Sequence, residues 1–224
     1  YKISTKIIND LFDGVESDLK ENVQLNSKKD LLIYSYRVAG SVGLMMAKIL
    51  NVKNQTALKS AIDLGIAMQL TNISRDVVED AKNNRSYISA NFDSIKETLQ
   101  LADLFYESSF ASINKIPLSF RFSILVARRV YRQIGYNILK KKNIENYNNS
   151  GKIYVNNIGK IIQTILSIFD FIRLSLIKSE DHLRDKEHLL INEEIFKVSL
   201  VLLFIVLCKL NPGMERFLIS SIGA

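Results

Sequence analysis

Two aspartates four positions apart, Asp76 and Asp80, are the side chains in this sequence that are best placed to do chemistry. Asn72 precedes Asp76 by four residues, and Gln69 precedes Asn72 by three. Because an α-helix turns by about 100° per residue, these four side chains share one narrow stripe of a helix. Carboxylate and amide oxygens are the ligands that hard divalent cations prefer. The stripe therefore indicates a Mg²⁺ site on Asn72, Asp76 and Asp80, with Mn²⁺ as the alternative ion.

Groups suited to phosphate flank the same stripe. Arg75 lies beside it, and Arg85 and Tyr87 follow just beyond the predicted end of the helix. Guanidinium groups bind phosphate oxygens through paired hydrogen bonds. The combination predicts a site in which Mg²⁺ bridges carboxylates and a diphosphate.

The stripe also has a simpler interpretation. Residues 56–82 carry an apolar side opposite the polar one, formed by Leu70, Ile73, Val77, Val78 and Ala81. An amphipathic helix of this kind usually turns its polar side to water. Acidic pairs with this spacing are common on such faces, so spacing alone leaves both a solvated face and a metal site open.

The elements that must position these groups follow from composition and periodicity. The chain has 224 residues, 47% hydrophobic and 24% charged, which is enough for one domain with a sizeable core. Two prolines and nine glycines are few for a β-rich protein, so we predict an all-α fold. We expect helices over residues 2–20, 30–50, 56–82, 93–114, 119–142 and 153–178, with connectors at 22–29 and 143–152.

Small residues interrupt the helix expected at 30–50. Gly40 and Gly43 would let another helix or a ligand approach the backbone closely. Tight helix packing alone explains them equally well.

Residues 179–224 are expected to form a separate tail. Its charged start contains His182 and His188, which we interpret as solvent-exposed and without a metal role. The apolar run at 195–208 is shorter than the ~20 residues needed to span a bilayer. A buried or interfacial helix is the expected structure there.

The formal net charge of +7 favours an anionic partner, such as a diphosphate, a membrane surface or nucleic acid. The basic run at 140–142 lacks interleaved aromatic residues, so we expect no nucleic-acid binding. We expect Arg128, Arg129 and Arg132 at the surface rather than in a site, with an inward-facing Arg128 and Tyr131 as the open alternative. The single cysteine excludes an intrachain disulfide framework.

Two segments carry a resemblance to a known family. YSYRVAGSVGLMM at 34–46 resembles the tyrosine-rich helix motif of the phytoene synthase/squalene synthase family, and LGIAMQLTNISRDVVEDAKNNRSYI at 64–88 resembles its second aspartate-rich motif. FDGVESDL at 12–19 and YRQIGYNIL at 131–139 give weaker support. The resemblance covers residues 5–168 and is strongest to bacterial phytoene synthases. It implies that residues 1–178 form a partial isoprenoid synthase domain.

The resemblance implies helices around a central cavity and a head-to-head condensation of two geranylgeranyl diphosphates. Phytoene would form by way of prephytoene diphosphate. The metal ligands would be Asn72, Asp76 and Asp80. The catalytic residues would be Asp76, Asp80, Tyr34 and Arg37. Substrate contacts would come from Gln69, Asn72, Arg75, Arg85, Tyr87, Gly43 and Tyr131.

Some features depart from the family. Its first aspartate-rich motif does not occur in this sequence, and Asp10, Asp13 and Asp18 do not replace it, so we expect N-terminal helices to be missing. Gly151 and Lys152 stand where an arginine is expected.

Two alternatives stay open. One is a squalene or presqualene diphosphate synthase that uses farnesyl diphosphate. The other is a non-catalytic, synthase-like partner of carotenoid enzymes. In each case we expect a cytoplasmic protein at the inner face of the membrane.

Overall fold

A computed structural model describes residues 3–177 and 181–191. The apolar run predicted at 195–208 lies outside the described residues. The chain divides into two compact units, Tyr1–Asp185 and Lys186–Ala224, and the helices below all belong to the first. The division predicted between residues 178 and 179 stays a prediction.

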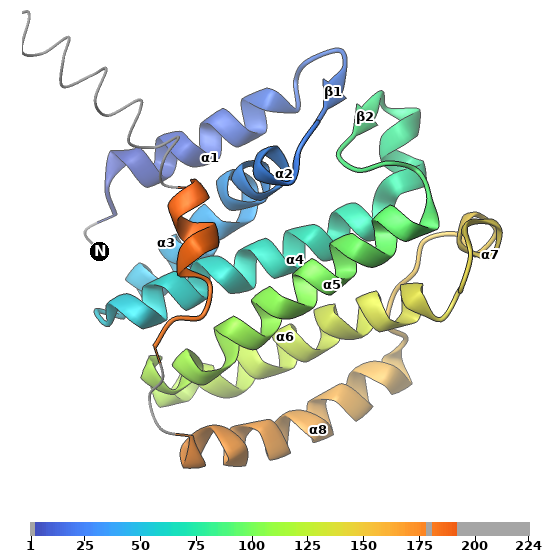
Figure 1. Ribbon diagram of the computed structural model, residues 1–224. Helices are drawn as coiled ribbons and strands as arrows, with labels where there is room; N and C mark the ends of the chain where they lie inside the picture. Colours follow the sequence, from blue (N-terminus) through green and yellow to red (C-terminus); the bar gives the residue numbers. More distant parts are fainter. Residues whose placement is uncertain (1–2, 178–180, 192–224) are drawn as a thin grey trace, which may run out of the picture. The chain divides into compact units, whose positions relative to one another are not determined.

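Long helices build the first unit (Figure 1). Figure 1 shows α4, α5, α6 and α8 as successive layers, with α1, α2 and α3 on the other side of α4. Their bounds are α1 Thr5–Ser17, α2 Lys28–Ser35, α3 Ser41–Ile49, α4 Gln55–Lys82, α5 Phe92–Phe110, α6 Leu118–Leu139, α7 Ile144–Asn148 and α8 Asn157–Leu176. The predicted all-α architecture is confirmed.

The strands in the described residues form one short parallel ladder. β1 (Val23–Gln24) pairs with β2 (Arg85–Ser86). The pairing fastens the connector after α1 to the segment that follows α4. It thereby brings Arg85 and Tyr87 against the end of α1.

Two expected elements differ from the structure. A π-helical turn at Tyr36–Gly40 divides the helix expected at 30–50 into α2 and α3. The connector expected at 143–152 contains α7, because the side chain of Asn143 accepts a hydrogen bond from the amide of Asn146 and caps the helix.

α4 fits the predicted helix closely. The side chain of Asn54 caps its start by accepting from the amide of Ala57, and Asn84 after its end has the left-handed φ of 55°. The side of α4 that packs into the core is formed by Ile66, Ala67, Leu70, Ile73 and Val77, all buried. This packing fixes the polar stripe on the opposite side.

Glycines let α3 and α4 meet backbone to backbone. A Cβ at Gly43 would overlap the carbonyl oxygen of Ala61, and a Cβ at Gly65 would overlap that of Ala39. Helix packing therefore accounts for Gly43. Its role as a substrate contact stays a prediction.

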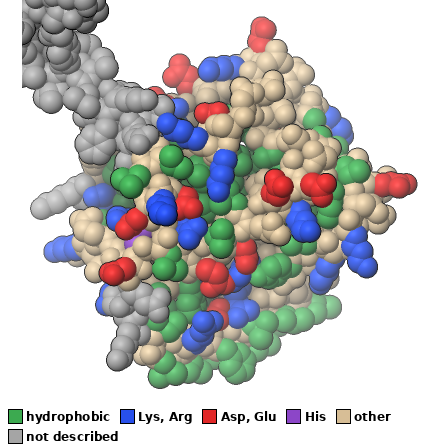
Figure 2. All heavy atoms as spheres, in the orientation of Figure 1, with side chains coloured by type: hydrophobic (Ala, Val, Ile, Leu, Met, Phe, Trp, Pro, Cys, Tyr) green, Lys and Arg blue, Asp and Glu red, His purple; other side chains and the backbone are tan. Residues whose placement is uncertain are grey.

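α8 buries polar side chains and exposes apolar ones, which is the reverse of the usual arrangement in a surface helix. Gln163, Ser167 and Asp170 on its inner side are buried, whereas Phe169 is 64% exposed and Leu176 is 80% exposed. Figure 2 shows the result as a band of hydrophobic side chains along the lower edge, where α8 lies. Further exposed members are Ile158, Ile161, Ile162, Ile165, Ile168 and Ile172. Among the described helices, none is both long and apolar enough to cross a membrane.

Two histidines expected at the surface have buried side chains, and so has Arg128, whose placement the sequence left open. The His182 side chain is only 2% exposed, and its Nε2 lies 2.7 Å from the buried Asp63 carboxylate, which needs a polar partner inside the protein. His188 is also buried. Arg128 is buried because its guanidinium donates to the carbonyl oxygen of Tyr106 and stacks on Phe110. The expectation of exposure was wrong for the two histidines, whereas for Arg128 the structure agrees with the inward-facing alternative.

Candidate functional site

The α4 stripe begins with an unsatisfied amide oxygen. Oδ1 of Asn72 is buried and, among the described residues, has no hydrogen-bond donor. Leaving such a group unpaired costs about 1–3 kcal/mol, which a cation at this position would relieve. Asp76 and Asp80 follow at the next two turns of the same face. The donor set therefore fits a hard divalent cation.

Asp76 is held between two cationic side chains. Arg75 donates to both carboxylate oxygens, with Nε–Oδ1 at 2.8 Å and Nη2–Oδ2 at 2.5 Å. The Nζ atom of Lys152 lies 3.6 Å from Oδ1 of Asp76 and 3.0 Å from Oε2 of Glu79. The hydrogen bond to Asp76 is the main cause that raises the pKa of Arg75. Both cations therefore lie beside Asp76, where they would bind the phosphate oxygens of a diphosphate that is bridged by metal to this carboxylate.

Among residues 3–177 and 181–191, no cationic side chain forms a comparable ion pair with Asp80. Burial, followed by the negative charge of Asp76, raises the pKa of Asp80 to about 6, although Arg85 acts in the opposite direction. The Asp80 carboxylate therefore has too little positive charge nearby to neutralise it. It would be stabilised by a divalent cation shared with Asp76 and Asn72.

A carboxylate and two tyrosines form the far side of the site. Tyr34 donates to Oδ2 of Asp18 at 2.9 Å, and Tyr87 donates to Oδ1 at 2.7 Å. The two phenol oxygens are 3.1 Å apart, and the rings stack with centroids separated by 4.7 Å. Burial is the largest cause that raises the pKa of both phenols, so both stay protonated donors.

Asp18 and Lys152 belong to this cluster although sequence reasoning gave neither a role. Arg85 also donates to the carbonyl oxygen of Asp18 at 3.2 Å, and the charge of Asp18 contributes to the raised pKa of Asp80. The signal for Asp18 was present in the family-like segment 12–19, where it was considered only as a substitute for the absent motif. The signal for Lys152 was the arginine expected near this position, which the sequence analysis treated only as a departure from the family.

The remaining predicted residues are less closely assembled. Gln69 shares the α4 stripe, and Tyr131 on α6 interacts electrostatically with Arg75. Arg37, in the π-helical turn, lies 3.8 Å from Asp13 on α1. The roles assigned to these residues, and those of the metal ligands, stay predictions.

Comparisons with known proteins show what this chain is similar to. The family model described as "Squalene/phytoene synthase" matches residues 1–92. The 15-cis-phytoene synthase of a Paracoccus species is 36% identical over 149 residues, which cover 58% of this chain and 49% of that protein. The 15-cis-phytoene synthase of Pantoea ananas is 35% identical over 150 residues, which cover 58% and 48%. The chain spans about half the length of the curated relatives it matches.

A solved structure shows the same fold. A dehydrosqualene synthase in complex with ligand superimposes with a TM-score of 0.58 and 24% identity, over 76% of this chain and 66% of that one. The fold is therefore that of the all-α isoprenoid synthases. The family-model match at residues 1–92 and the similarity to the curated synthases confirm the resemblance stated above.

Proposed function

We propose that this protein takes part in Mg²⁺-dependent prenyl transfer, condensing two geranylgeranyl diphosphates to phytoene by way of prephytoene diphosphate. The observation that carries the proposal is the α4 stripe. On this face the side-chain oxygen of Asn72 has no hydrogen-bond donor among the described residues, and the pKa of Asp80 is raised. Both residues share the face with Asp76. The names of the curated relatives support the choice of phytoene as product.

Each group then has a part in binding or ionisation. Asn72, Asp76 and Asp80 would hold Mg²⁺, which when bound neutralises the charge that develops on a departing diphosphate. Arg75, Arg85 and Lys152 would bind phosphate oxygens. When a diphosphate takes the donors of Arg75 and Lys152, the Asp76 carboxylate is released from its present ion pairs.

The stacked tyrosines complete the proposal. Their phenols donate to Asp18 and so fix both rings beside the site. Tyrosine rings turned toward an allylic cation would stabilise it through their π faces. The departing diphosphate can accept the proton that the product loses, so no strong protein base is required.

Metal binding tests the site without requiring turnover. Mn²⁺ replaces Mg²⁺ as the probe, and its electron paramagnetic resonance signal reports the free ion. Asp80→Asn should weaken binding at least tenfold, since it removes a charged ligand. The matched control is Glu97→Gln, an exposed acid on α5. Equal binding by all three proteins would overturn the assignment.

Product analysis tests the reaction. The full chain is incubated with Mg²⁺ and either geranylgeranyl or farnesyl diphosphate. Phytoene from the first substrate supports the proposal. A product from farnesyl diphosphate alone would replace it with the squalene-type alternative. Intact metal binding without either product would favour the non-catalytic partner of carotenoid enzymes.

We also propose that α8 touches the surface of an anionic membrane. Its outer side is apolar, its exposed charged side chains are Lys160 and Arg173, and its aspartate, Asp170, is buried against Arg129. An apolar side bordered by cations matches the interface of a bilayer that contains acidic lipids. Sedimentation with phosphatidylglycerol vesicles should carry the protein down, and Ile165→Gln with Phe169→Gln should abolish this. Unchanged sedimentation of that double variant would overturn the proposal.

A further inference from the structure

Two neighbouring pockets lie away from the α4 stripe, between α5, α6 and α8. The first has a volume of about 340 Å³, and its apolar wall includes Leu99, Leu104 and Leu139. The second has a volume of about 300 Å³ and is lined by four arginines, Arg128, Arg129, Arg132 and Arg173. The aspartates of the candidate site line neither pocket.

Two of the four arginines already have carboxylate partners. Arg129 pairs with Asp170, with Nε–Oδ2 at 2.5 Å and Nη2–Oδ1 at 3.0 Å. Arg132 pairs in the same way with Asp103, at 2.5 and 2.8 Å. Because the charges of Arg129 and Arg132 are balanced by these carboxylates, the positive charge available to a ligand must come from Arg128 and Arg173.

Arg128 is a buried cation with little negative charge close to its guanidinium. It is 4% exposed, and its Nε and Nη2 donate to the carbonyl oxygen of Tyr106 at 3.0 and 2.8 Å. Among the described residues its ion-pair partner is the half-exposed Glu107, whose Oε1 lies 3.9 Å from Nη2. Burial, followed by the positive charge of Arg132, lowers the pKa of Arg128 to about 10. An anion beside this guanidinium would therefore be stabilised.

Arg173 adds a second available cation. Its guanidinium lies 5.2 Å from the centre of the Phe110 ring, and that of Arg128 lies 4.9 Å from the same centre. In the part of the chain that the structure describes, Arg173 has no ion pair within 4.0 Å. Two guanidinium groups held by one aromatic ring suit the several oxygens of a phosphate.

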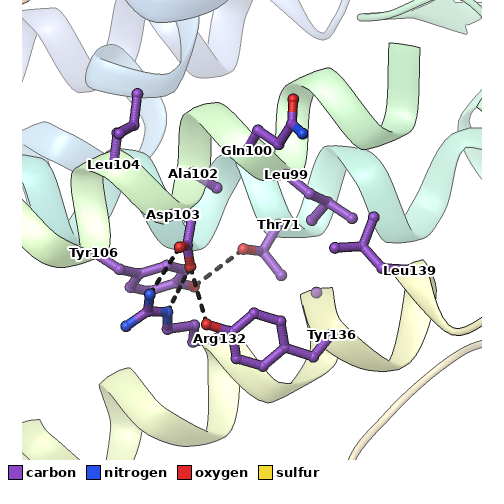
Figure 3. A pocket seen from close by; sticks show the side chains of 11 residues that line it. Thr71, Leu99, Gln100, Ala102, Asp103, Leu104, Tyr106, Arg132, Tyr136 and Leu139 are labelled. Carbon is purple, nitrogen blue, oxygen red and sulfur yellow. Dashed lines mark hydrogen bonds and ion pairs between the residues drawn. The ribbon is translucent and has the colours of Figure 1, made fainter. Parts of the chain in front are cut away.

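The arginine pocket and the apolar pocket share a wall. Arg132 and Tyr136 line both. Figure 3 shows these two side chains rising from α6 to meet Asp103 of α5, with Leu99 and Leu139 on the apolar side. Gly135 leaves the apolar pocket open, because a Cβ there would lie 3.1 Å from Cδ2 of Leu99.

We propose that the two pockets form one binding site for an amphipathic phosphate, with the phosphate group beside Arg128 and Arg173 and a short apolar chain along Leu99 and Leu139. The site is separate from the α4 stripe, so the proposal goes beyond the function proposed above. It requires no metal ion.

Calorimetric titration of the full chain with octyl phosphate tests the proposal. EDTA is present throughout, so that the metal-dependent site cannot bind the probe. We expect saturable binding that is at least tenfold tighter than that of inorganic phosphate, because each buried methylene contributes about a fourfold gain. Equal affinity for both probes would overturn the role of the apolar pocket. Absence of octyl phosphate binding would overturn the whole site.

Matched variants locate the binding. Arg173→Gln should weaken octyl phosphate at least tenfold, whereas Lys160→Gln, the same loss of charge on α8 outside the pocket, should leave the affinity unchanged. Gly135→Val should reduce octyl phosphate affinity toward that of inorganic phosphate. Equal losses in the Arg173 and Lys160 variants would show attraction by net charge and overturn the proposal. So would loss of binding in Asp80→Asn, which would place the probe at the α4 stripe.

Discussion

The phenol oxygen of Tyr87 lies 2.7 Å from the Asp18 carboxylate, which also accepts a hydrogen bond from Tyr34 at 2.9 Å. Asp18 and Tyr87 are 69 positions apart, and the β1–β2 ladder brings their segments together. A single carboxylate thus joins the end of α1, the helix α2 and the segment after α4. The proposed metal ligands, Asn72, Asp76 and Asp80, lie on a fourth element, α4.

Replacing Asp18 should loosen this junction. Asp18→Ala removes the acceptor of two buried or half-buried phenols, and we expect the free energy of unfolding to fall by about 2 kcal/mol. Urea denaturation measures the change. Asp13→Ala is the control, because Asp13 is exposed and has only a 3.8 Å pairing with Arg37. Equal effects of the two substitutions would mean that the Asp18 hydrogen bonds do not hold the junction.

Asp80 should make stability depend on pH in a defined direction. Its pKa is about 6 in the folded chain, above the ordinary aspartate value of 3.8, so the folded state holds the proton more tightly than the unfolded chain. Its contribution to the free energy of unfolding therefore falls as pH rises from about 4 to about 6, and stays constant above that. Asp80→Asn should stabilise the metal-free protein at pH 7.5 by about 1–2 kcal/mol, after allowance for solvent screening.

Unfolding curves at two pH values separate this effect from packing. The wild type and Asp80→Asn should be equally stable near pH 3.5, where both side chains are neutral. A difference that is the same at both pH values would contradict the electrostatic explanation. Added Mg²⁺ should reduce the difference at pH 7.5.

The close contact between α3 and α4 should not tolerate a methyl group. Gly65→Ala would force a Cβ against the backbone of Ala39, and we expect a loss of about 2–3 kcal/mol in spite of alanine's better helix propensity. Gly135→Ala on α6 meets only the end of the Leu99 side chain, and should be neutral or stabilising. Thermal unfolding of the two variants gives the comparison. Similar melting temperatures would show that the α3–α4 contact can relax.

Lys152 should contribute to anion binding at the α4 stripe. Lys152→Ala removes a cation that lies 3.6 Å from Asp76, and should weaken Mg²⁺-dependent binding of inorganic diphosphate by about threefold to tenfold. Lys53→Ala is the control at an exposed position elsewhere. Calorimetry in the presence of Mg²⁺ measures both. If the two variants bind alike, Lys152 does not face the ligand.

Local patterns in the sequence determined the α4 stripe. Helical spacing places Asn72, Asp76 and Asp80 on one face whatever surrounds them, and the apolar residues opposite decide which side is buried. The same periodicity predicted most of the helices. The motif at 64–88 also carried the resemblance to the family, because all of its residues lie close together in the sequence.

Tertiary structure alone decided what meets that stripe. Asp18 and Lys152 reach the site through the β1–β2 ladder and the chain after α7, and no periodicity relates either residue to α4. The sequence also suggested a surface position for His182, since polar side chains usually lie outside, and left the placement of Arg128 open. Their burial depends on partners such as Asp63 and the Tyr106 carbonyl, which only the packing of segments distant in the sequence supplies. Local spacing determines the face of a helix, and packing determines its neighbours.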